Sequence, residues 1–228
     1  MKISEGSLVG REHWINGSLP VGKNNQDAYA WGIRDGAVCA VVADGCGSGT
    51  HSEIGAQIGV RAVMEWWTKS REPACIDLTE HVIAKLRLAS FVFGDSPQAV
   101  NDHFLFTLLI AIVDPRFGTF VLGCGDGVYA VDGIESVELK PQEGNAPNYL
   151  GYNLLRPGKC RIDTHFSTGK CERVIIGTDG LAHYKGWESD WKSWVDNQVQ
   201  LTRRFRMRHH ELPDDITAIG VDLCTFTK

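Results

Sequence analysis

Residues 37–45 read AVCAVVADG, an apolar run that ends in an Asp-Gly pair at Asp44. Two further apolar runs end in the same pair, TFVLGCGDG at Asp126 and RVIIGTDG at Asp179. A fourth run, in PDDITAIGV, begins just after an Asp-Asp pair that starts at Asp214. Such runs are typical of buried β-strands, and the last side chain of a strand lies at the rim of its sheet. The pattern therefore predicts strands that gather carboxylates at one edge.

Carboxylates gathered in this way indicate a metal site. They repel one another and resist desolvation unless a cation neutralises them, and an all-carboxylate site favours hard ions such as Mg²⁺ or Mn²⁺. Asp-Gly is also the commonest hairpin turn signal. We assign two of the five Asp-Gly pairs, at Asp35 and Asp132, to ordinary turns because they lie between short strand-like runs.

Length and composition exclude several classes of protein. The chain has 228 residues, enough for one domain spanning 1–228 with a substantial core. Its formal net charge of −5, with both signs interspersed, argues against a nucleic-acid partner. We find no apolar stretch near the ~20 residues that span a membrane and no signal-peptide core, so we expect a cytoplasmic protein without membrane contact. The seven cysteines include no Cys-x-x-Cys, which disfavours a zinc site.

The order of the predicted elements indicates an antiparallel α+β fold. Strands are expected over 27–33, 36–44, 104–114, 118–126, 127–133, 173–179 and 216–223. Helices are expected over about 51–70 and 78–93 and within 187–209. The three strands between 104 and 133 read as an antiparallel meander, and 141–170 as the most loop-like part. Strands that pair mainly with their neighbours, together with a few amphipathic helices, indicate layered sheets.

The segment 42–49, VADGCGSG, carries the most specific chemistry. It places Asp44 at a strand end, before a glycine-rich turn and a helix for which Thr50 and Glu53 form a predicted capping box. Glycines allow close approach to a ligand, and free amides at a helix start favour an anion. The segment could therefore hold a cation close to a phosphate, or be a plain glycine loop. Asp27 could join the acidic rim or simply cap its strand.

Five motifs in this order resemble the metal-dependent Ser/Thr protein phosphatases of type 2C, the PPM family, and in particular a bacterial branch of small domains. They are NQDAY (25–29), VVADGCGSG (41–49), VLGCGDGVYA (121–130), VIIGTDGLA (174–182) and DDITAIGV (214–221). The resemblance runs from about residue 10 to 223. It implies a four-layer α-β-β-α sandwich with two central antiparallel sheets flanked by helices, and a monomer that binds two or three Mn²⁺ or Mg²⁺ ions.

The resemblance also implies roles for individual residues. Asp44 would bridge two metal ions and Gly45 would offer its carbonyl oxygen, while Asp179 and Asp214 would bind the first ion. These three acids would make up the catalytic set. A water or hydroxide that bridges the two ions would attack phosphoserine or phosphothreonine, since paired divalent ions lower the pKa of a shared water and neutralise phosphoryl oxygens. The implied partners are a phosphoprotein substrate and a cognate Ser/Thr kinase.

Two further acids complete the implied metal site. Asp126 would help to hold a third, weaker ion, and Asp27 would lie near the water shell of the second. The arginine that usually grips the substrate phosphate is missing, and Lys23 is the nearby cation. Lysine binds phosphate as a point charge and lacks the bidentate fork of arginine.

Three other positions depart from the family pattern. Gln26 stands where many members have Glu, Cys46 replaces a His or Met, and Gly127 replaces the Ser of Gly-Asp-Ser. Two alternatives to a phosphoprotein phosphatase therefore stay open: a pseudophosphatase that binds a phosphorylated partner without turnover, and a metal-dependent hydrolase of small phosphate esters. The basic run at 203–210 is interpreted as a solvated helix face, with steering of phosphoproteins as the alternative.

Overall fold

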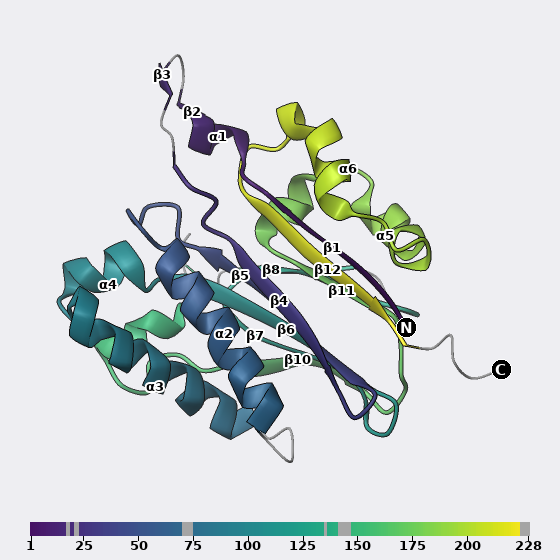
Figure 1. The fold of residues 1–228 in the computed structure, drawn as a ribbon, viewed down its shortest axis with the longest axis horizontal. Coiled ribbons are helices and arrows are strands. Elements are labelled where there is room, and N and C mark those ends of the chain that lie inside the picture. The colour runs from purple at the N-terminus through teal and green to yellow at the C-terminus, as the bar shows by residue number, and fades with distance from the viewer. Residues whose placement is uncertain (17–18, 21–22, 70–74, 135, 141–146, 224–228) are drawn as a thin grey trace.

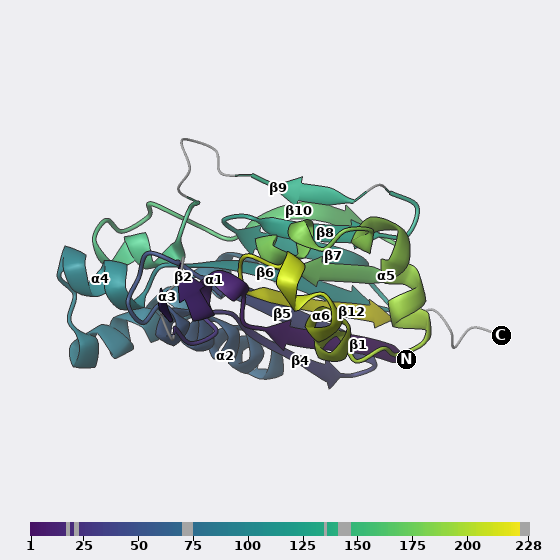
Figure 2. The ribbon, with the colours of Figure 1, turned by 90° about the horizontal axis from the view of Figure 1, so that it is seen from above.

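Two five-stranded antiparallel sheets stack face to face and carry helices on their outer sides (Figures 1 and 2). The computed structural model describes residues 1–16, 19–20, 23–69, 75–134, 136–140 and 147–223. One sheet has the order β1 (Lys2–Leu8), β12 (Ile216–Asp222), β11 (Val174–Gly177), β8 (Gly127–Val131), β9 (Val137–Leu139). The other has the order β10 (Asp163–Thr168), β7 (Gly118–Cys124), β6 (Phe106–Asp114), β5 (Ala37–Gly45), β4 (Ala28–Arg34).

The helices form the two outer layers. The β5 sheet is covered by α2 (Glu53–Lys69) and α3 (Cys75–Phe93), with α4 (Pro97–His103) at one end. The β12 sheet is covered by α5 (Trp187–Asp196) and α6 (Leu201–Met207). The remaining elements are α1 (Arg11–Trp14), the short pair β2 (Ile15–Asn16) and β3 (Leu19–Pro20), and the 3₁₀ turns η1 (Leu150–Leu154), η2 (Asp179–His183) and η3 (His209–Glu211).

Alternation along β5 builds two of the three apolar layers. Cys39 and Val41 are packed in a cluster with α2 and α3, whereas Val38, Ala40 and Val42 belong to a cluster that fills the space between the sheets. Successive side chains of a strand point to opposite faces, so a strand buried on both faces is apolar throughout. A third cluster joins the β12 sheet to α5 and α6, where Trp187, Trp191 and Trp194 are buried. These layers confirm the predicted four-layer sandwich.

The predicted meander is wrong at its third strand. Although β6 and β7 pair as expected, β8 pairs with β11 and β9 in the other sheet. The chain changes sheet at Gly125, Asp126 and Gly127, where both glycines have positive φ values of 102° and 139°. A residue with a β-carbon strongly disfavours such angles. The crossing carries Asp126 to the end of the space between the sheets.

Two local predictions are corrected in the same way. The helix α2 begins at Glu53, and the Thr50 hydroxyl donates a 3.2 Å hydrogen bond to Asp102, so the predicted capping box is wrong. The segment 141–170, expected to be a loop, contains η1 and β10, and β10 pairs with β7; residues 141–146 lie outside the described part.

Two turns agree with the sequence prediction, and one strand was not predicted. Asp35 and Asp132 lie in turns, as predicted, and Asp35 has a φ of 52° beside Gly36 at 79°. The strand β1 was not predicted, because its few apolar residues give no continuous run, and it pairs with β12 from the opposite end of the chain. Within the described ranges, no helix has both the length and the apolar character needed to cross a lipid bilayer.

Candidate active site

Four acidic residues from both sheets meet at one end of the space between the sheets. Asp44 lies at the end of β5, Asp126 in the crossing from β7 to β8, Asp179 just after β11 and Asp214 just before β12. Burial raises the pKa of Asp44 well above its ordinary value, and the charges of Asp27, Asp179, Asp214 and Asp126 raise it further. The sequence prediction that these strand ends gather carboxylates is therefore confirmed by their electrostatic coupling.

The pKa values of Asp126 and Asp179 are raised for the same reason. Burial raises the pKa of Asp126 to about 6, and the charges of Asp179 and Asp214 contribute to this. The pKa of Asp179 is raised first by burial and then by the charge of Asp214. Its Oδ1 atom is buried and has no hydrogen-bond partner among the described residues. The cluster thus holds uncompensated negative charge in a partly dehydrated site.

Asp27 lies buried next to this cluster. Thr178, the residue before Asp179, donates a 2.9 Å hydrogen bond from its hydroxyl to Asp27 Oδ2. Burial and the charge of Asp215 raise the pKa of Asp27 well above its ordinary value. The Oδ1 atom of Asp27 is a second buried carboxylate oxygen without a hydrogen-bond partner in the described part of the chain. The pairing with Thr178 places Asp27 close to the predicted metal ligand Asp179.

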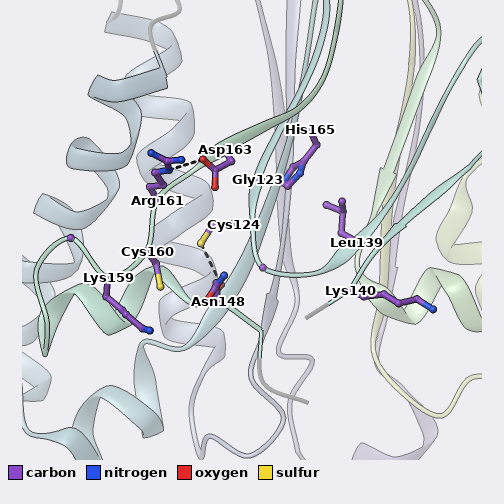
Figure 3. Close-up of a pocket in the computed structure, with 12 residues that line it drawn as sticks. Gly123, Cys124, Leu139, Lys140, Asn148, Lys159, Cys160, Arg161, Asp163 and His165 are labelled. Atoms are coloured by element: carbon purple, nitrogen blue, oxygen red, sulfur yellow. Dashed lines mark hydrogen bonds and ion pairs between the residues drawn. The ribbon is translucent and has the colours of Figure 1, made fainter. Parts of the chain in front are cut away.

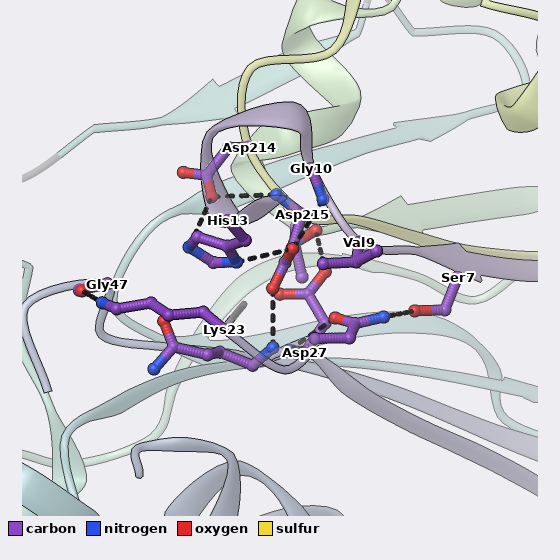
Figure 4. A network of polar contacts seen from close by, with 12 residues as sticks. Ser7, Val9, Gly10, His13, Lys23, Asp27, Gly47, Asp214 and Asp215 are labelled. Carbon is purple, nitrogen blue, oxygen red and sulfur yellow. Dashed lines mark hydrogen bonds and ion pairs between the residues drawn. The ribbon is translucent and has the colours of Figure 1, made fainter. Parts of the chain in front are cut away.

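Asp215 has a role that sequence analysis missed (Figure 4). Its buried carboxylate accepts hydrogen bonds from the backbone amides of Gly10, at 2.7 Å, and Gln26, at 2.6 Å. It also lies 2.9 Å from Nδ1 of His13, and this interaction raises the pKa of His13. Asp215 thus ties two N-terminal segments to the start of β12. The Asp-Asp pair in the sequence could have indicated a separate role for Asp215, because adjacent residues near a strand point to opposite sides.

Asp214 is more exposed than Asp215, and its carboxylate lies 3.9 Å from Nε2 of the same His13. Its side chain is 50% exposed and accepts a 2.8 Å hydrogen bond from the backbone amide of Asp215. Ligand atoms of His13, Asp214 and Asp215 all lie within 4.8 Å of one another. A β-carbon on Gly10 would lie only 2.1 Å from the Asp214 carbonyl carbon, so the N-terminal segment packs directly on the Asp214 backbone.

The glycine loop after Asp44 is held by Gln26. The Gly45 amide donates to the Gln26 carbonyl oxygen at 3.2 Å, and a β-carbon on Gly45 would lie 2.7 Å from that oxygen. The side-chain amide of Gln26 donates to the Gly49 carbonyl oxygen at 3.1 Å and to Ser52 Oγ at 2.7 Å. A glutamate could not donate these two bonds. The glutamine at this position therefore suits the local backbone of this chain.

Lys23 contacts this loop, and Cys46 is part of it. The Lys23 ammonium donates to the Gly47 carbonyl oxygen, and its charge lowers the pKa of His13 (Figure 4). The Cys46 sulfur lies 3.1 Å from Ser48 Oγ. Burial raises the pKa of the Cys46 thiol, but hydrogen bonds with Ser48 and Tyr149 outweigh burial and lower it overall. The loop that follows Asp44 thus contains a thiol of lowered pKa and binds a cation through a backbone carbonyl.

Comparison with known proteins agrees with this architecture. The chain is 27% identical over 183 residues to serine/threonine-protein phosphatase 3 of Escherichia coli strain K12, covering 77% of this chain and 71% of that protein. A crystal structure of a bacterial serine phosphatase with a point substitution matches with a TM-score of 0.69 at 13% identity, covering 98% of each chain. RsbX, solved in complex with magnesium, matches with a TM-score of 0.55 at 18% identity, covering 96% of this chain and 94% of RsbX.

The family assignment rests on a further match. The sequence profile described as protein phosphatase 2C matches residues 9–214, which is most of the chain and includes the strand ends that carry Asp44, Asp126, Asp179 and Asp214. This protein therefore belongs to the protein phosphatase 2C family.

Proposed function

We propose that this protein is a metal-dependent phosphoprotein phosphatase that hydrolyses phosphoserine and phosphothreonine, with residues 1–228 as one catalytic domain. The observation that carries the proposal is the cluster of Asp44, Asp126, Asp179 and Asp214, in which burial and the neighbouring negative charges raise the pKa of Asp44, Asp126 and Asp179. Such a cluster is unfavourable unless cations neutralise it.

The residues present fit divalent cations. The donors are carboxylate oxygens, which hard ions such as Mg²⁺ and Mn²⁺ prefer. The buried Oδ1 atoms of Asp179 and Asp27 have no hydrogen-bond partner among the described residues and are free to accept a metal or a metal-bound water. Asp44, the Gly45 carbonyl, Asp179 and Asp214 would hold two ions. Asp126 would hold a third, and Asp27 would act through the water shell.

Chemistry at this site needs no protein nucleophile. When bound, two divalent cations supply a water of lowered pKa and neutralise charge on the phosphoryl oxygens. The chain's own residues hold the segments around the proposed metal ligands in place. Gln26 holds the loop that follows Asp44, and Asp215 holds the N-terminal segment against Asp214. Lys23, beside the same loop, would attract the substrate phosphate as a point charge.

The test is turnover of a phosphothreonine peptide by metal-depleted protein that is reloaded with Mn²⁺ or Mg²⁺. Replacing Asp44→Asn should lower kcat by about 10³-fold, since it removes several kcal/mol of metal-dependent stabilisation. The same variant should raise the Tm of the metal-free protein, because one repelled carboxylate is gone, and should reduce the rise in Tm on adding Mn²⁺. Asp35→Asn, in an exposed turn, is the matched control and should behave as wild type.

A second candidate function, binding of a phosphorylated partner without turnover, is favoured by one observation. Lys23 replaces the expected arginine, and its ammonium is already engaged by the Gly47 carbonyl oxygen. Under this alternative, metal-loaded wild type and Asp44→Asn would release phosphate at the same background rate, and the phosphatase proposal would be rejected. Metal-dependent turnover that Asp44→Asn abolishes would instead reject the binding-only alternative.

A further inference from the structure

A cavity of about 570 Å³ lies at the end of β7 (Figure 3). Gly123, Cys124 and Gly125 form part of its wall, and Asp126 is the next residue along the chain. The loop that precedes β10 and the start of β10 form another part, and the end of β9 and Asn148 contribute the rest. A substrate whose phosphate reaches the acidic cluster would therefore have this cavity beside it.

The cavity has a cationic lining although the protein as a whole carries a net charge of −5. The loop 155–161 contains Arg156, Lys159 and Arg161 and no acidic residue, and the last two line the cavity. Lys140 contributes from the end of β9. Among the lining residues that the structure describes, Lys140, Lys159 and Arg161 outnumber the one acidic residue, Asp163.

The ion pairs around the cavity leave most of this charge available. Arg161 lies 2.7 Å from Asp163 and Lys140 lies 3.6 Å from Glu138, but all four side chains are at least half exposed. Exposed pairs of this kind contribute little and exchange readily with other anions. Lys159 makes no ion pair with any residue in the described part of the chain.

The backbone of the loop between Lys159 and Arg161 is held by a buried side chain. The buried side chain of Asn153 donates to the Cys160 carbonyl oxygen at 2.9 Å and accepts from the Cys160 amide at 3.2 Å. The cavity wall opposite is also tied down, since the Cys124 thiol donates to the Asn148 carbonyl oxygen at 3.3 Å. Groups held in this way lose little conformational entropy when they bind a ligand.

We propose that this cavity is a subsite for an anionic side chain, a carboxylate or a second phosphoryl group, close in sequence to the phosphorylated residue of the substrate. The inference rests on the proposed phosphatase function and adds a substrate preference to it. The physical reason is the charge of the lining: Lys140, Lys159 and Arg161 would attract an anionic group, while the neighbouring acidic cluster, neutralised by its divalent cations, would receive the phosphate.

The experiment compares Lys159→Glu with Lys170→Glu. Lys170 is exposed and follows β10 at the end opposite to Asp163, so the two variants change the net charge equally. The substrates are a phosphothreonine peptide flanked by aspartates, the same peptide flanked by asparagines, and one in which a second phosphothreonine replaces the aspartates. For Lys159→Glu we expect kcat/KM to fall about tenfold on either anionic peptide, mainly through KM, and less than about twofold on the asparagine peptide.

The controls make the result decisive. Lys170→Glu should leave all three substrates unchanged, and the effect of Lys159→Glu should vanish at about 1 M salt, where the Debye length is about 3 Å. Whichever anionic peptide loses kcat/KM identifies the group that the cavity binds. Equal losses on anionic and neutral peptides, or equal behaviour of the two variants, would overturn the subsite.

Failure of the subsite is separable from failure of the phosphatase function. Hydrolysis of p-nitrophenyl phosphate and of the asparagine peptide tests the metal site without the cavity. If these are hydrolysed and no discrimination is seen, the subsite alone is rejected. If nothing is hydrolysed, fluorescence anisotropy of the aspartate peptide decides: tighter binding to wild type than to Lys159→Glu supports the cavity, and equal binding rejects it.

Discussion

The side-chain amide of Gln26 donates a 2.7 Å hydrogen bond to the hydroxyl oxygen of Ser52, and both residues are buried. Ser52 in turn donates to the Cys46 carbonyl oxygen at 2.9 Å. This relay connects the segment before β4 to the glycine loop and to the start of α2. The loop that follows Asp44, at the end of β5, is thus held by a neutral hydrogen-bond donor, the side-chain amide of Gln26. The family resemblance leads us to expect an acid at this position.

Replacing Gln26→Glu should destabilise the protein by about 2 kcal/mol, because a buried acceptor-only group would face the Gly49 carbonyl oxygen and lose both donated bonds. Urea unfolding of the metal-free protein measures the change. Gln57→Glu, on the exposed side of α2, makes the same chemical change and should cost less than about 0.5 kcal/mol. Equal midpoints for the two variants would contradict the relay.

Gly10→Ala should destabilise the protein by about 2–4 kcal/mol and weaken binding of Mn²⁺, since its β-carbon would lie 2.1 Å from the Asp214 carbonyl carbon and 2.5 Å from its Cα. Backbone atoms cannot move aside as a flexible side chain can, so Asp214 must shift. Urea unfolding and titration of Mn²⁺ by calorimetry measure the two effects. Gly169→Ala, which meets nothing within 4 Å, is the control. Unchanged Mn²⁺ affinity in Gly10→Ala would argue against Asp214 as a ligand.

The metal-free protein should lose stability as the pH rises from about 4 to about 6. The pKa of Asp126 is raised to about 6 in the folded state, so the folded protein binds this proton more tightly than the unfolded chain does. By linkage, the favourable contribution is present below the unfolded pKa and lost as pH rises through the folded pKa. Thermal unfolding should show Tm falling by about a few degrees over this range. Asp126→Asn should flatten the profile, and Asp35→Asn should not; a profile of unchanged slope in Asp126→Asn would refute the assignment.

Lys23→Ala should lower kcat/KM on a phosphothreonine peptide by about 10–100-fold, the equivalent of one charged hydrogen bond. Lys23→Arg should retain or raise kcat/KM, because a guanidinium supplies the bidentate fork that lysine lacks. Steady-state assays at saturating Mn²⁺ measure both variants. If Lys23→Ala matches wild type, another group must bind the phosphate.

Buried strands were the part of the fold that could be predicted most reliably. Runs such as 36–44 and 216–223 are apolar on both faces because helices cover one side of each sheet and the other sheet covers the second. Which strands pair with one another in a sheet was less predictable. Nothing local in Gly127–Val131 indicates that β8 joins β11 in place of β7, since pairing is chosen by the packing of the whole sandwich.

The sequence by itself determined that carboxylates stand at strand ends and that Asp35 and Asp132 belong to turns. These inferences need only the pattern of a buried strand and the turn chemistry of Asp-Gly, whereas a joint role for Asp44, Asp126, Asp179 and Asp214 was implied by the resemblance to the family. Only the tertiary structure decided that Asp215 turns inward to hold Gly10 and Gln26 while Asp214 stays half exposed.

The cationic cavity was likewise a result of the tertiary structure. Loop 155–161 and the end of β7 are separated by about thirty residues in the chain and become neighbours because β10 pairs with β7. Local periodicity reports which face of an element is buried, but the contact between distant segments depends on the packing of every layer together. For the same reason the acidic cluster could be anticipated from its motifs, whereas the groups that surround it could not.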